Sequence, residues 1–416
     1  MTEDAVAALV VIVVVAVIAP FVADRLHTWF AMPVVVAEIL LGILVGPAAL
    51  GLVTVTDGDV IAALSDLGLA FLMFLAGYEI DFARIKGRPL RLSVFGWLIS
   101  LVLGVSTALL LAADQETGLV VGLALTTTAL GTILPILRDS GQATTPFGVR
   151  VLAVGAVGEF GPILAIAFAF SGDRPVHTTV VLVLFAIAGV FAAWVARRPR
   201  HPRLARLVTA TLGTSAQLGV RICVFLVIGM FAFAEFLGLD PILGAFVAGI
   251  VVHLFLAAGS EHEAEAVLSR LEGIGFGFFI PLFFVVSGVR FDLDALLSDG
   301  RALLLLPVFL VLFLVMRGVP TWLLHRNELP GRQPVALGLF AATALPLIVV
   351  ITSIGVDEGA MLPATAASLV GAGMISVLLF PLLGLRLLSA PAVVAAEGEA
   401  AAEAERPAER EDFLGY

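Results

Sequence analysis

The sequence contains few charged residues for its length, since only 13% of its 416 residues are Asp, Glu, Lys or Arg. A soluble domain is about one quarter charged and about half apolar, whereas 60% of this chain is hydrophobic and its mean hydropathy is +1.11. These values exclude a disordered chain and a water-soluble enzyme, because too few polar side chains exist to cover an apolar globule of this size. A lipid bilayer is the solvent that such a chain requires.

Cysteine and basic charge are also scarce. Cys223 is the only cysteine, which excludes an intrachain disulfide and a thiolate metal cage, and the six histidines are scattered and form no HExxH pair. The net charge of −10 excludes a basic nucleic-acid-binding protein. Part of this acidity is local, because residues 397–412 carry seven carboxylates and two arginines. No cofactor motif is present, so neither a cofactor nor covalent catalysis is expected.

Long apolar runs fill most of the chain and predict an all-α polytopic membrane protein. A spanning helix needs about 20 mostly apolar residues. By that criterion thirteen transmembrane helices are predicted, near residues 5–23, 33–51, 60–80, 91–112, 118–137, 148–170, 178–196, 213–237, 241–258, 275–290, 302–324, 333–354 and 363–388.

The distribution of Lys and Arg between loops predicts the orientation. Short cytoplasmic loops collect basic residues. Taking the loops that follow odd-numbered spans as cytoplasmic, that side carries eighteen basic residues and the opposite side carries three. The amino terminus is therefore predicted outside and the carboxyl terminus in the cytoplasm, with an odd number of spans.

The two halves of the chain resemble one another. Four short segments recur in the same order with an offset of 207 to 216 residues, and they pair Gly42 with Gly249, Gly77 with Gly288, Thr128 with Thr343 and Gly155 with Gly371. The repeat shifts the chain by seven spans, so the halves must cross the membrane with opposite topology. Inverted repeats are typical of secondary transporters, whose substrate site lies near the midplane between the halves.

Two spans in corresponding positions of the halves carry helix-breaking signals. The fifth span contains Thr127, Thr128, Gly131 and Pro135, and its repeat partner contains Thr343 and Pro346. Proline removes a backbone donor, and threonine hydroxyls bond the groups that are freed. Paired interruptions of this kind are the best sequence indication of a transporter site. They predict two broken helices that cross.

Of the ionisable residues inside predicted spans, three are candidates for the site. Glu159 is central in the sixth span, where a charge costs about 3 kcal/mol, and its repeat partner is Ile375, so the fold alone does not require an acid there. Arg317 is central in the eleventh span and needs an oxygen partner because it cannot be deprotonated. Glu159 is the first candidate for that partner and Glu38, in the second span, is a weaker one.

Four stretches of the chain carry a resemblance to a known family. They are Pro33–Pro47, Leu67–Asp81, the threonine-rich break of the fifth span, and Pro281–Gly288. Together with the repeat they cover about residues 10–388, and by them the chain resembles the cation:proton antiporter superfamily, which has the sodium/proton exchanger fold. The first and last stretches are similar to the bacterial branch that includes potassium-efflux systems.

The resemblance has departures that affect what it implies. Family members usually carry Asp-Asp, Asn-Asp or Gln-Asp in the sixth span, where this chain has Gly158–Glu159, so ion selectivity and stoichiometry are not transferred. Arg317 stands where electrogenic relatives place a lysine, and those relatives imply an ion pair with the acid of the sixth span. Potassium-efflux relatives append a nucleotide-binding domain, whereas about 28 residues without a GxGxxG motif follow the last span here, so nucleotide gating is not expected.

The residues and the resemblance together predict a secondary antiporter that exchanges Na⁺ or K⁺ for H⁺ by alternating access in a bacterial-type cell membrane. Glu159 is the predicted shared carboxylate, with Thr127, Thr128 and Thr343 as oxygen ligands, and Arg317 and Glu38 as supporting charges. The predicted helix breaks are at Gly131, Pro135 and Pro346. One titrating acid predicts electroneutral 1:1 exchange, and the family implies a homodimer.

The predicted exchanger domain covers residues 1–390, with repeat one at about 5–170, a linker helix at about 178–196 and repeat two at about 210–388. An acidic, disordered cytoplasmic tail is predicted at 391–416. Two alternatives stay open: an organic-anion symporter of the same fold, in which Arg317 contacts a substrate carboxylate, and a membrane sensor that transports nothing.

Overall fold

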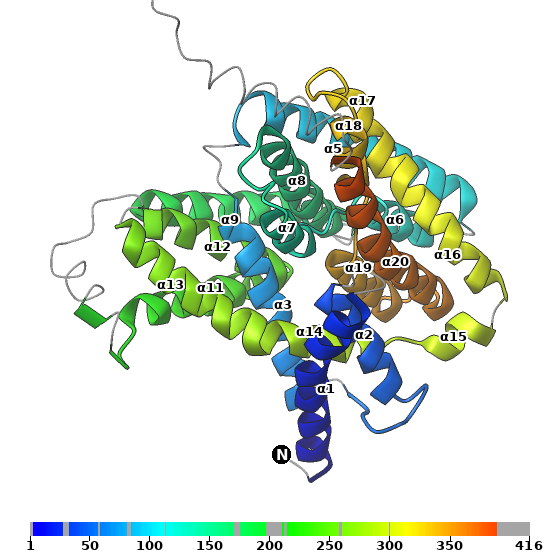
Figure 1. Cartoon of the computed structure of the whole chain (residues 1–416), viewed down its shortest axis with the longest axis horizontal. Coiled ribbons are helices and arrows are strands. Elements are labelled where there is room, and N and C mark those ends of the chain that lie inside the picture. Colours follow the sequence, from blue (N-terminus) through cyan, green and yellow to red (C-terminus); the bar gives the residue numbers. More distant parts are fainter. Residues whose placement is uncertain are drawn as a thin grey trace, which may run out of the picture.

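The computed structural model of the chain describes residues 3–27, 33–56, 59–80, 85–112, 114–169, 175–196, 210–211, 214–257, 260–298 and 300–388. The predicted tail at 391–416 and the arginine-rich segment 197–206 lie outside these ranges. The described residues form helices joined by loops (Figure 1). The helices are α1 Glu3–His27, α2 Val34–Val45, α3 Val60–Tyr78, α5 Arg88–Leu111, α6 Gln115–Ala124, α7 Leu130–Asp139, α8 Pro146–Ala169, α9 Pro175–Ala196, α11 Leu218–Phe236, α12 Pro241–Ala257, α13 Glu261–Ile274, η1 Gly275–Phe279, α14 Ile280–Val289, α15 Leu293–Ser298, α16 Gly300–Phe313, η2 Leu314–Gly318, α17 Val319–His325, α18 Gln333–Ala341, α19 Pro346–Asp357 and α20 Pro363–Leu388.

Each of the thirteen predicted spans coincides with helix, but helix length alone identifies fewer of them. Among the described residues, ten helical stretches are long and apolar enough to cross a bilayer, and α2 and α12 are apolar but shorter. The remaining predicted span, 118–137, is divided into α6 and α7, of ten residues each. The chain is thus an all-helical membrane protein, as the sequence predicts.

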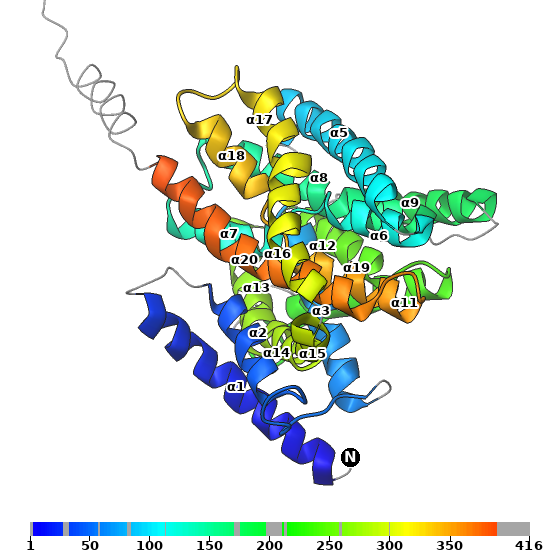
Figure 2. The same ribbon diagram turned by 90° about the vertical axis from the view of Figure 1, so that its right-hand side faces the viewer.

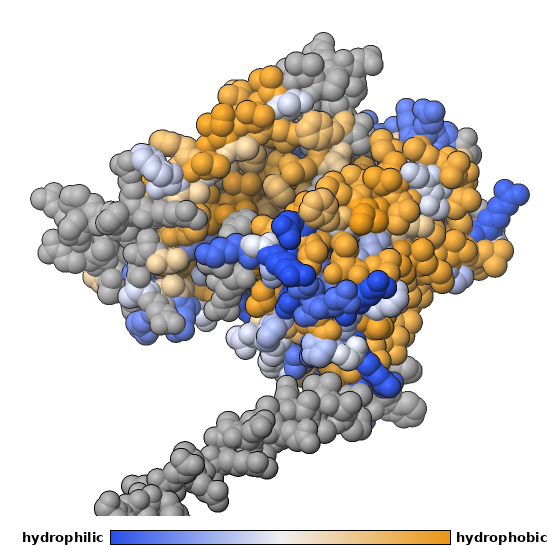
Figure 3. Space-filling view, turned by 90° about the horizontal axis from the view of Figure 1, so that it is seen from above, coloured by the Kyte–Doolittle hydropathy of each residue, from blue (hydrophilic) through white to orange (hydrophobic). Residues whose placement is uncertain are grey.

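The lipid-facing character of the surface is visible in the exposed side chains. Leu110 and Phe236 are each 85% exposed, and Phe225 is 74% exposed. Apolar side chains cover most of the face seen in Figure 3, with polar side chains gathered in a band across it. Such a surface is stable in a bilayer, because lipid replaces the partner that an apolar patch would need in water.

The packing repeats in the same way as the sequence. Helix α2 packs on α14, and α3 packs on α12. In the first pair, a Cβ at Gly42 would lie 3.0 Å from the Gly288 Cα; in the second, a Cβ at Gly249 would lie 2.9 Å from the Gly77 carbonyl carbon. Gly42 corresponds to Gly249 and Gly77 to Gly288, so one glycine-to-glycine contact occurs twice. The sequence repeat is therefore also a structural repeat, in which the α2/α14 contact of one pair corresponds to the α12/α3 contact of the other.

The remaining helices surround the elements that carry the site. Helix α1 lies along one side of the bundle against α2 (Figure 2), and α5 packs on α6, α8 and α17. Helix α20 packs on α16, α18 and α19. The two interrupted pairs, α6/α7 and α18/α19, are each held by a long neighbouring helix, which is α8 for the first pair and α20 for the second.

Candidate functional site

The first helix interruption is made by threonines. Helix α6 ends at Ala124 and α7 begins at Leu130. The Thr126 hydroxyl donates to the Leu123 carbonyl at 2.8 Å, and the Thr127 hydroxyl donates to the Ala124 carbonyl at 2.9 Å. These side chains compete with the next backbone donors for the last carbonyls of α6, which ends the helix.

The prediction that the fifth span breaks at Gly131 and Pro135 is wrong. Gly131 and Pro135 lie inside α7, after the interruption, which covers residues 125–129. The proline does not mark the break, because α6 has already ended at Ala124 and α7 begins at Leu130, five residues before Pro135. Pro346 is placed as predicted, since it is the first residue of α19, where its missing N–H would have no helical partner anyway.

The two interruptions touch one another directly. The Ala129 N–H donates to the Thr343 carbonyl at 2.8 Å, and the Thr128 hydroxyl donates to the Ala341 carbonyl at 2.7 Å. Thr128 is 1% exposed and Thr343 is fully buried. The predicted crossing of two broken helices is therefore present, and four half-helix ends converge on it.

Arg317 contributes a buried guanidinium to this crossing. It lies 1% exposed in the π-helical turn η2, which interrupts the helix formed by α16 and α17. Its Nε donates to the Thr128 hydroxyl oxygen at 2.9 Å, and its Nη2 donates to the Val154 carbonyl at 2.8 Å. A cation here compensates the negative carbonyl ends of α6 and α18, and π-helical turns often occur at functional sites.

The predicted ion pair between Arg317 and Glu159 is not formed. Both Glu159 oxygens and the Arg317 Nη1 are buried without a hydrogen-bond partner. The oxygens of Thr128 and Val154 occupy the other two guanidinium nitrogens instead. Nor does Glu38, the weaker candidate, pair with Arg317 within the described residues; it lies in α2 and is 4% exposed.

Glu159 is the one candidate carboxylate at the crossing. It lies in α8 and is fully buried. The Thr128 N–H donates to the carbonyl of Gly158, the residue before it, at 3.0 Å, so α8 is joined to the first interruption at this point. An ionised carboxylate buried without a partner is strongly destabilised, so this group requires either a proton or a cation.

The small size of Gly158 is required by the groups around it. A Cβ at this position would overlap the Thr128 hydroxyl oxygen and would lie 2.5 Å from the Arg317 Nη2. The guanidinium and the hydroxyl therefore occupy the space that a side chain at position 158 would need. The absence of a side chain at Gly158 is therefore what allows the Arg317 guanidinium to lie beside Thr128.

The other predicted oxygen ligands are present but are tied to their own helices. The Thr127 hydroxyl donates to Ala124, and the Thr343 hydroxyl donates to the Leu339 carbonyl at 3.1 Å. A hydroxyl that donates its hydrogen keeps lone pairs with which it binds a cation. Within the described residues, no cluster of His, Cys, Asp and Glu fits a resident metal ion.

A wide cleft opens at the end of the bundle where α11 ends and α12 begins. It has a volume of about 790 Å³, and its lining includes Asp66, Glu235, Asp240, Asp292 and Asp357 beside Arg290. Asp240 accepts a hydrogen bond from the Ile242 N–H at 2.9 Å at the start of α12. Burial raises the pKa of the Asp240 carboxyl, and this hydrogen bond opposes the rise.

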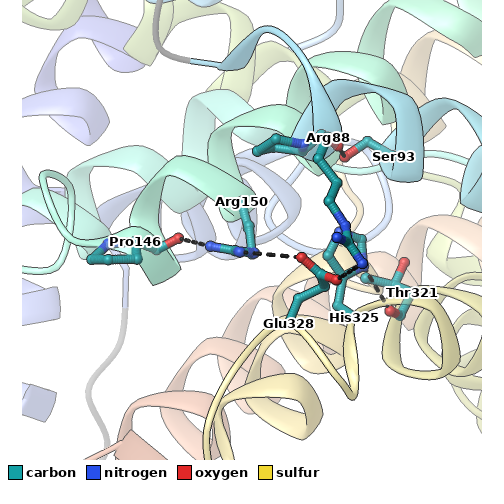
Figure 4. Close-up of polar contacts among 8 residues, drawn as sticks. Arg88, Ser93, Pro146, Arg150, Thr321, His325 and Glu328 are labelled. Carbon is teal, nitrogen blue, oxygen red and sulfur yellow. Dashed lines mark hydrogen bonds and ion pairs between the residues drawn. The ribbon is translucent and has the colours of Figure 1, made fainter.

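A second polar group, which we call the Glu328 cluster, consists of Arg88, Arg150, His325 and Glu328 (Figure 4). The Glu328 carboxylate lies 2.5 Å from Arg88 of α5 and 3.6 Å from Arg150 of α8. His325 is 1% exposed, and its Nδ1 lies 2.9 Å from the Thr321 carbonyl. The cluster joins α8, which carries Glu159, to the helix that carries Arg317.

Sequence reasoning missed three contributors to the site. Thr321 and His325 follow Arg317 at intervals of four residues, and the Thr321 hydroxyl donates to the Arg317 carbonyl at 2.9 Å; this spacing was a usable signal. Ser376 of α20 is fully buried and accepts the Ala344 N–H at 3.0 Å. Its only sequence signal is its place next to Ile375, the repeat partner of Glu159.

Comparison with known proteins places the chain in a family of transporters. Residues 12–386 match the family described as "Sodium/hydrogen exchanger, transmembrane". The chain is 31% identical over 374 residues to the putative Na(+)/H(+) antiporter YjbQ of Bacillus subtilis, covering 85% of this chain and 58% of that protein. It is 27% identical over 298 residues to the Na(+)/H(+)-K(+) antiporter GerN of Bacillus cereus, covering 70% of this chain and 73% of that protein.

A solved structure shares the fold. The sodium proton antiporter MjNhaP1 from Methanocaldococcus jannaschii, determined at pH 8, superposes with a TM-score of 0.62 at 15% identity, covering 95% of this chain and 99% of that one. This likeness concerns the fold alone. The chain spans less than two thirds of the length of the Bacillus subtilis relative.

Proposed function

The chain belongs to the sodium/hydrogen exchanger family, and from this premise we propose that it is a secondary antiporter exchanging Na⁺ or K⁺ for H⁺. The observation that carries the proposal is Glu159, a fully buried carboxylate without a hydrogen-bond partner, beside the crossing of two helix interruptions. A proton and a cation each satisfy this carboxylate, and they cannot do so together. Competition between them couples the two fluxes.

The cation's remaining ligands come from the crossing. Oxygen ligands suit a hard monovalent cation, and Thr127, Thr128 and Thr343 supply hydroxyl and carbonyl oxygens at the two interruptions. Arg317 holds the Thr128 hydroxyl in place and balances the carbonyl ends of the half-helices. Its fixed charge also limits the site to one further positive charge, which is either the proton or the cation.

Alternating access requires the site to open to each side in turn. We propose thirteen spans in two halves of opposite topology, with the amino terminus outside and the carboxyl terminus in the cytoplasm of a bacterial-type cell. The acidic cleft beside Asp240 then opens outward and attracts cations. We also propose a homodimer, as the family resemblance implies.

Two other functions make different use of the same residues. An organic-anion symporter would use the unpartnered Nη1 of Arg317 to bind a carboxylate substrate, and a sensor would move nothing. Everted membrane vesicles with an imposed pH gradient distinguish the three. An antiporter collapses the gradient when Na⁺ or K⁺ is added, a symporter responds only to an organic anion, and a sensor responds to neither. Absence of a cation response would refute the proposed function.

A further inference from the structure

The crossing leaves one backbone donor and one backbone acceptor unused. It is made by two peptide units, Thr128–Ala129 and Thr343–Ala344, both trans. In a trans peptide the N–H and the C=O point in opposite directions. When the Ala129 N–H faces the Thr343 carbonyl, the Thr128 carbonyl must point away from that peptide, and so must the Ala344 N–H.

Repeat symmetry cannot correct this imbalance. The repeat pairs Thr128 with Thr343 and Ala129 with Ala344, so the symmetric counterpart of the observed bond joins the Ala344 N–H to the Thr128 carbonyl. Two trans peptides cannot form both bonds at once. One interruption must donate the crossing hydrogen bond and the other must accept it. A further group is needed to stabilise one of these two directions over the other.

Ser376 satisfies the unused donor. Its hydroxyl oxygen accepts the Ala344 N–H at 3.0 Å and donates its own hydrogen to the Gly373 carbonyl at 2.7 Å, with the Ala344 carbonyl at 3.1 Å. A Cβ at Gly373 would lie 2.7 Å from the Ala344 carbonyl oxygen, so a glycine is needed for α20 to approach this closely. The repeat partner of Ser376 is Phe160, which has no hydroxyl.

The carbonyl that the crossing bond does not use, that of Thr128, lies at the other interruption. Among the described residues, the Thr128 carbonyl receives one hydrogen bond, from the Leu130 N–H two residues later at 3.2 Å. The amide of the same residue is bonded to Gly158, next to Glu159. The carbonyl oxygen that the crossing bond does not use therefore belongs to Thr128, the residue whose N–H is hydrogen-bonded to α8 next to Glu159.

We propose that Ser376 is a positioning residue for cation binding: by holding the Ala344 N–H it fixes the direction of the crossing bond and leaves the Thr128 carbonyl oxygen for the transported cation. This proposal rests on the proposed antiport function. The Ser376 hydroxyl bonds Ala344 and Gly373 and makes no hydrogen bond to Glu159. It therefore governs the affinity of the site for the cation and leaves the intrinsic proton affinity of the Glu159 carboxylate unchanged.

The test compares Ser376→Ala with Ser368→Ala in proteoliposomes, using Na⁺ and K⁺ as the cations and a pH-sensitive dye inside. Ser368 is an equally buried serine on the same helix, and its hydroxyl donates to the Ala302 carbonyl of α16, remote from the crossing. We expect Ser376→Ala to raise the KM for the transported cation about tenfold, since an unpaired buried N–H disturbs the crossing peptide. Because proton and cation compete for Glu159, the pH of half-maximal exchange should be unchanged when each protein is measured at the same multiple of its own KM. Ser368→Ala should leave the KM within about twofold.

Two conservative substitutions keep the result decisive. Ser376→Thr retains the hydroxyl and should restore the wild-type KM, and Ser376→Cys should give an intermediate value; both serve if the alanine variant does not fold. A wild-type KM in Ser376→Ala, or equal KM changes in the two alanine variants, would overturn the assignment. Failure of the wild-type protein to exchange either cation would instead refute the proposed function.

Discussion

Gly158 leaves room beside Glu159 for the Thr128 hydroxyl and the Arg317 guanidinium. A methyl group at this position would overlap the hydroxyl oxygen and lie 2.5 Å from the Arg317 Nη2. Neither neighbour is free to withdraw, because each is fully buried and hydrogen-bonded to another element. The smallest possible change at this residue therefore alters the site.

We expect Gly158→Ala to reduce cation-dependent exchange by at least tenfold and to lower the thermal stability, because overpacking a tight site costs about 1–3 kcal/mol. Initial rates in vesicles and the unfolding temperature in detergent measure the two effects. Gly229→Ala is the matched control, since a Cβ at Gly229 in α11 meets nothing within 4 Å. Equal behaviour of the two variants would contradict the assigned crowding.

The identities of the site residues can be predicted from the sequence, but their partners cannot. Glu159 and Arg317 are conspicuous as charges in apolar spans, and pairing them follows from charge alone. The structure pairs Arg317 with Thr128 and Val154 instead. Carbonyl acceptors such as Val154 are present at every residue of a sequence, and only folding selects the one that a guanidinium reaches.

At the scale of elements, the interruptions illustrate the same limit. Proline at 135 marks the correct span but the wrong residue, because Thr126 and Thr127 end α6 first through hydrogen bonds to their own helix. In the second half, Pro346 begins α19 as predicted. The repeat was recognisable from glycines, and the structure gives the reason: Gly42 and Gly249 are needed where two helix backbones touch.

The Glu328 cluster ties three elements together at one end of the site. We expect Glu328→Gln to lower the unfolding temperature by a few degrees, since the change leaves Arg88 and Arg150 without their shared carboxylate; the loss should be about 1 kcal/mol because Arg88 is largely exposed. Glu265→Gln, at an exposed position on α13, is the control. A Glu328→Gln protein as stable as this control would show that the cluster does not hold the helices.

For the whole molecule, the thirteen-span arrangement makes a prediction about sidedness. The single native cysteine, Cys223, is fully buried, so an introduced cysteine reports its own accessibility. We expect a cysteine at the exposed position Arg332 to react with an impermeant maleimide only from the cytoplasm, and one at Glu358 only from outside. The reverse pattern would overturn the proposed orientation, although the antiporter proposal would survive it.

The charge balance of the site predicts electroneutral exchange. Gly158 provides no second acid and Arg317 stays charged at physiological pH, so only Glu159 alternates between proton and cation. A potential of 100 mV performs about 2.3 kcal/mol of work per net charge, equivalent to a roughly 50-fold shift in the equilibrium gradient. We expect no such shift in proteoliposomes clamped with valinomycin and a fixed K⁺ gradient, with Na⁺ as the test cation. A clear shift would indicate a second titrating group, and Glu38 would be examined first.

The central claim is that one buried carboxylate serves both the proton and the cation, and its most direct test is exchange by Glu159→Gln. The measurement is the initial rate of Na⁺- or K⁺-driven pH change in proteoliposomes, with Glu265→Gln as a control of equal charge change. We expect the Glu159→Gln protein to insert and fold, because it lacks a charge that is costly to bury, and to show no exchange, while the control retains the wild-type rate. Exchange at the wild-type rate by Glu159→Gln would contradict the account.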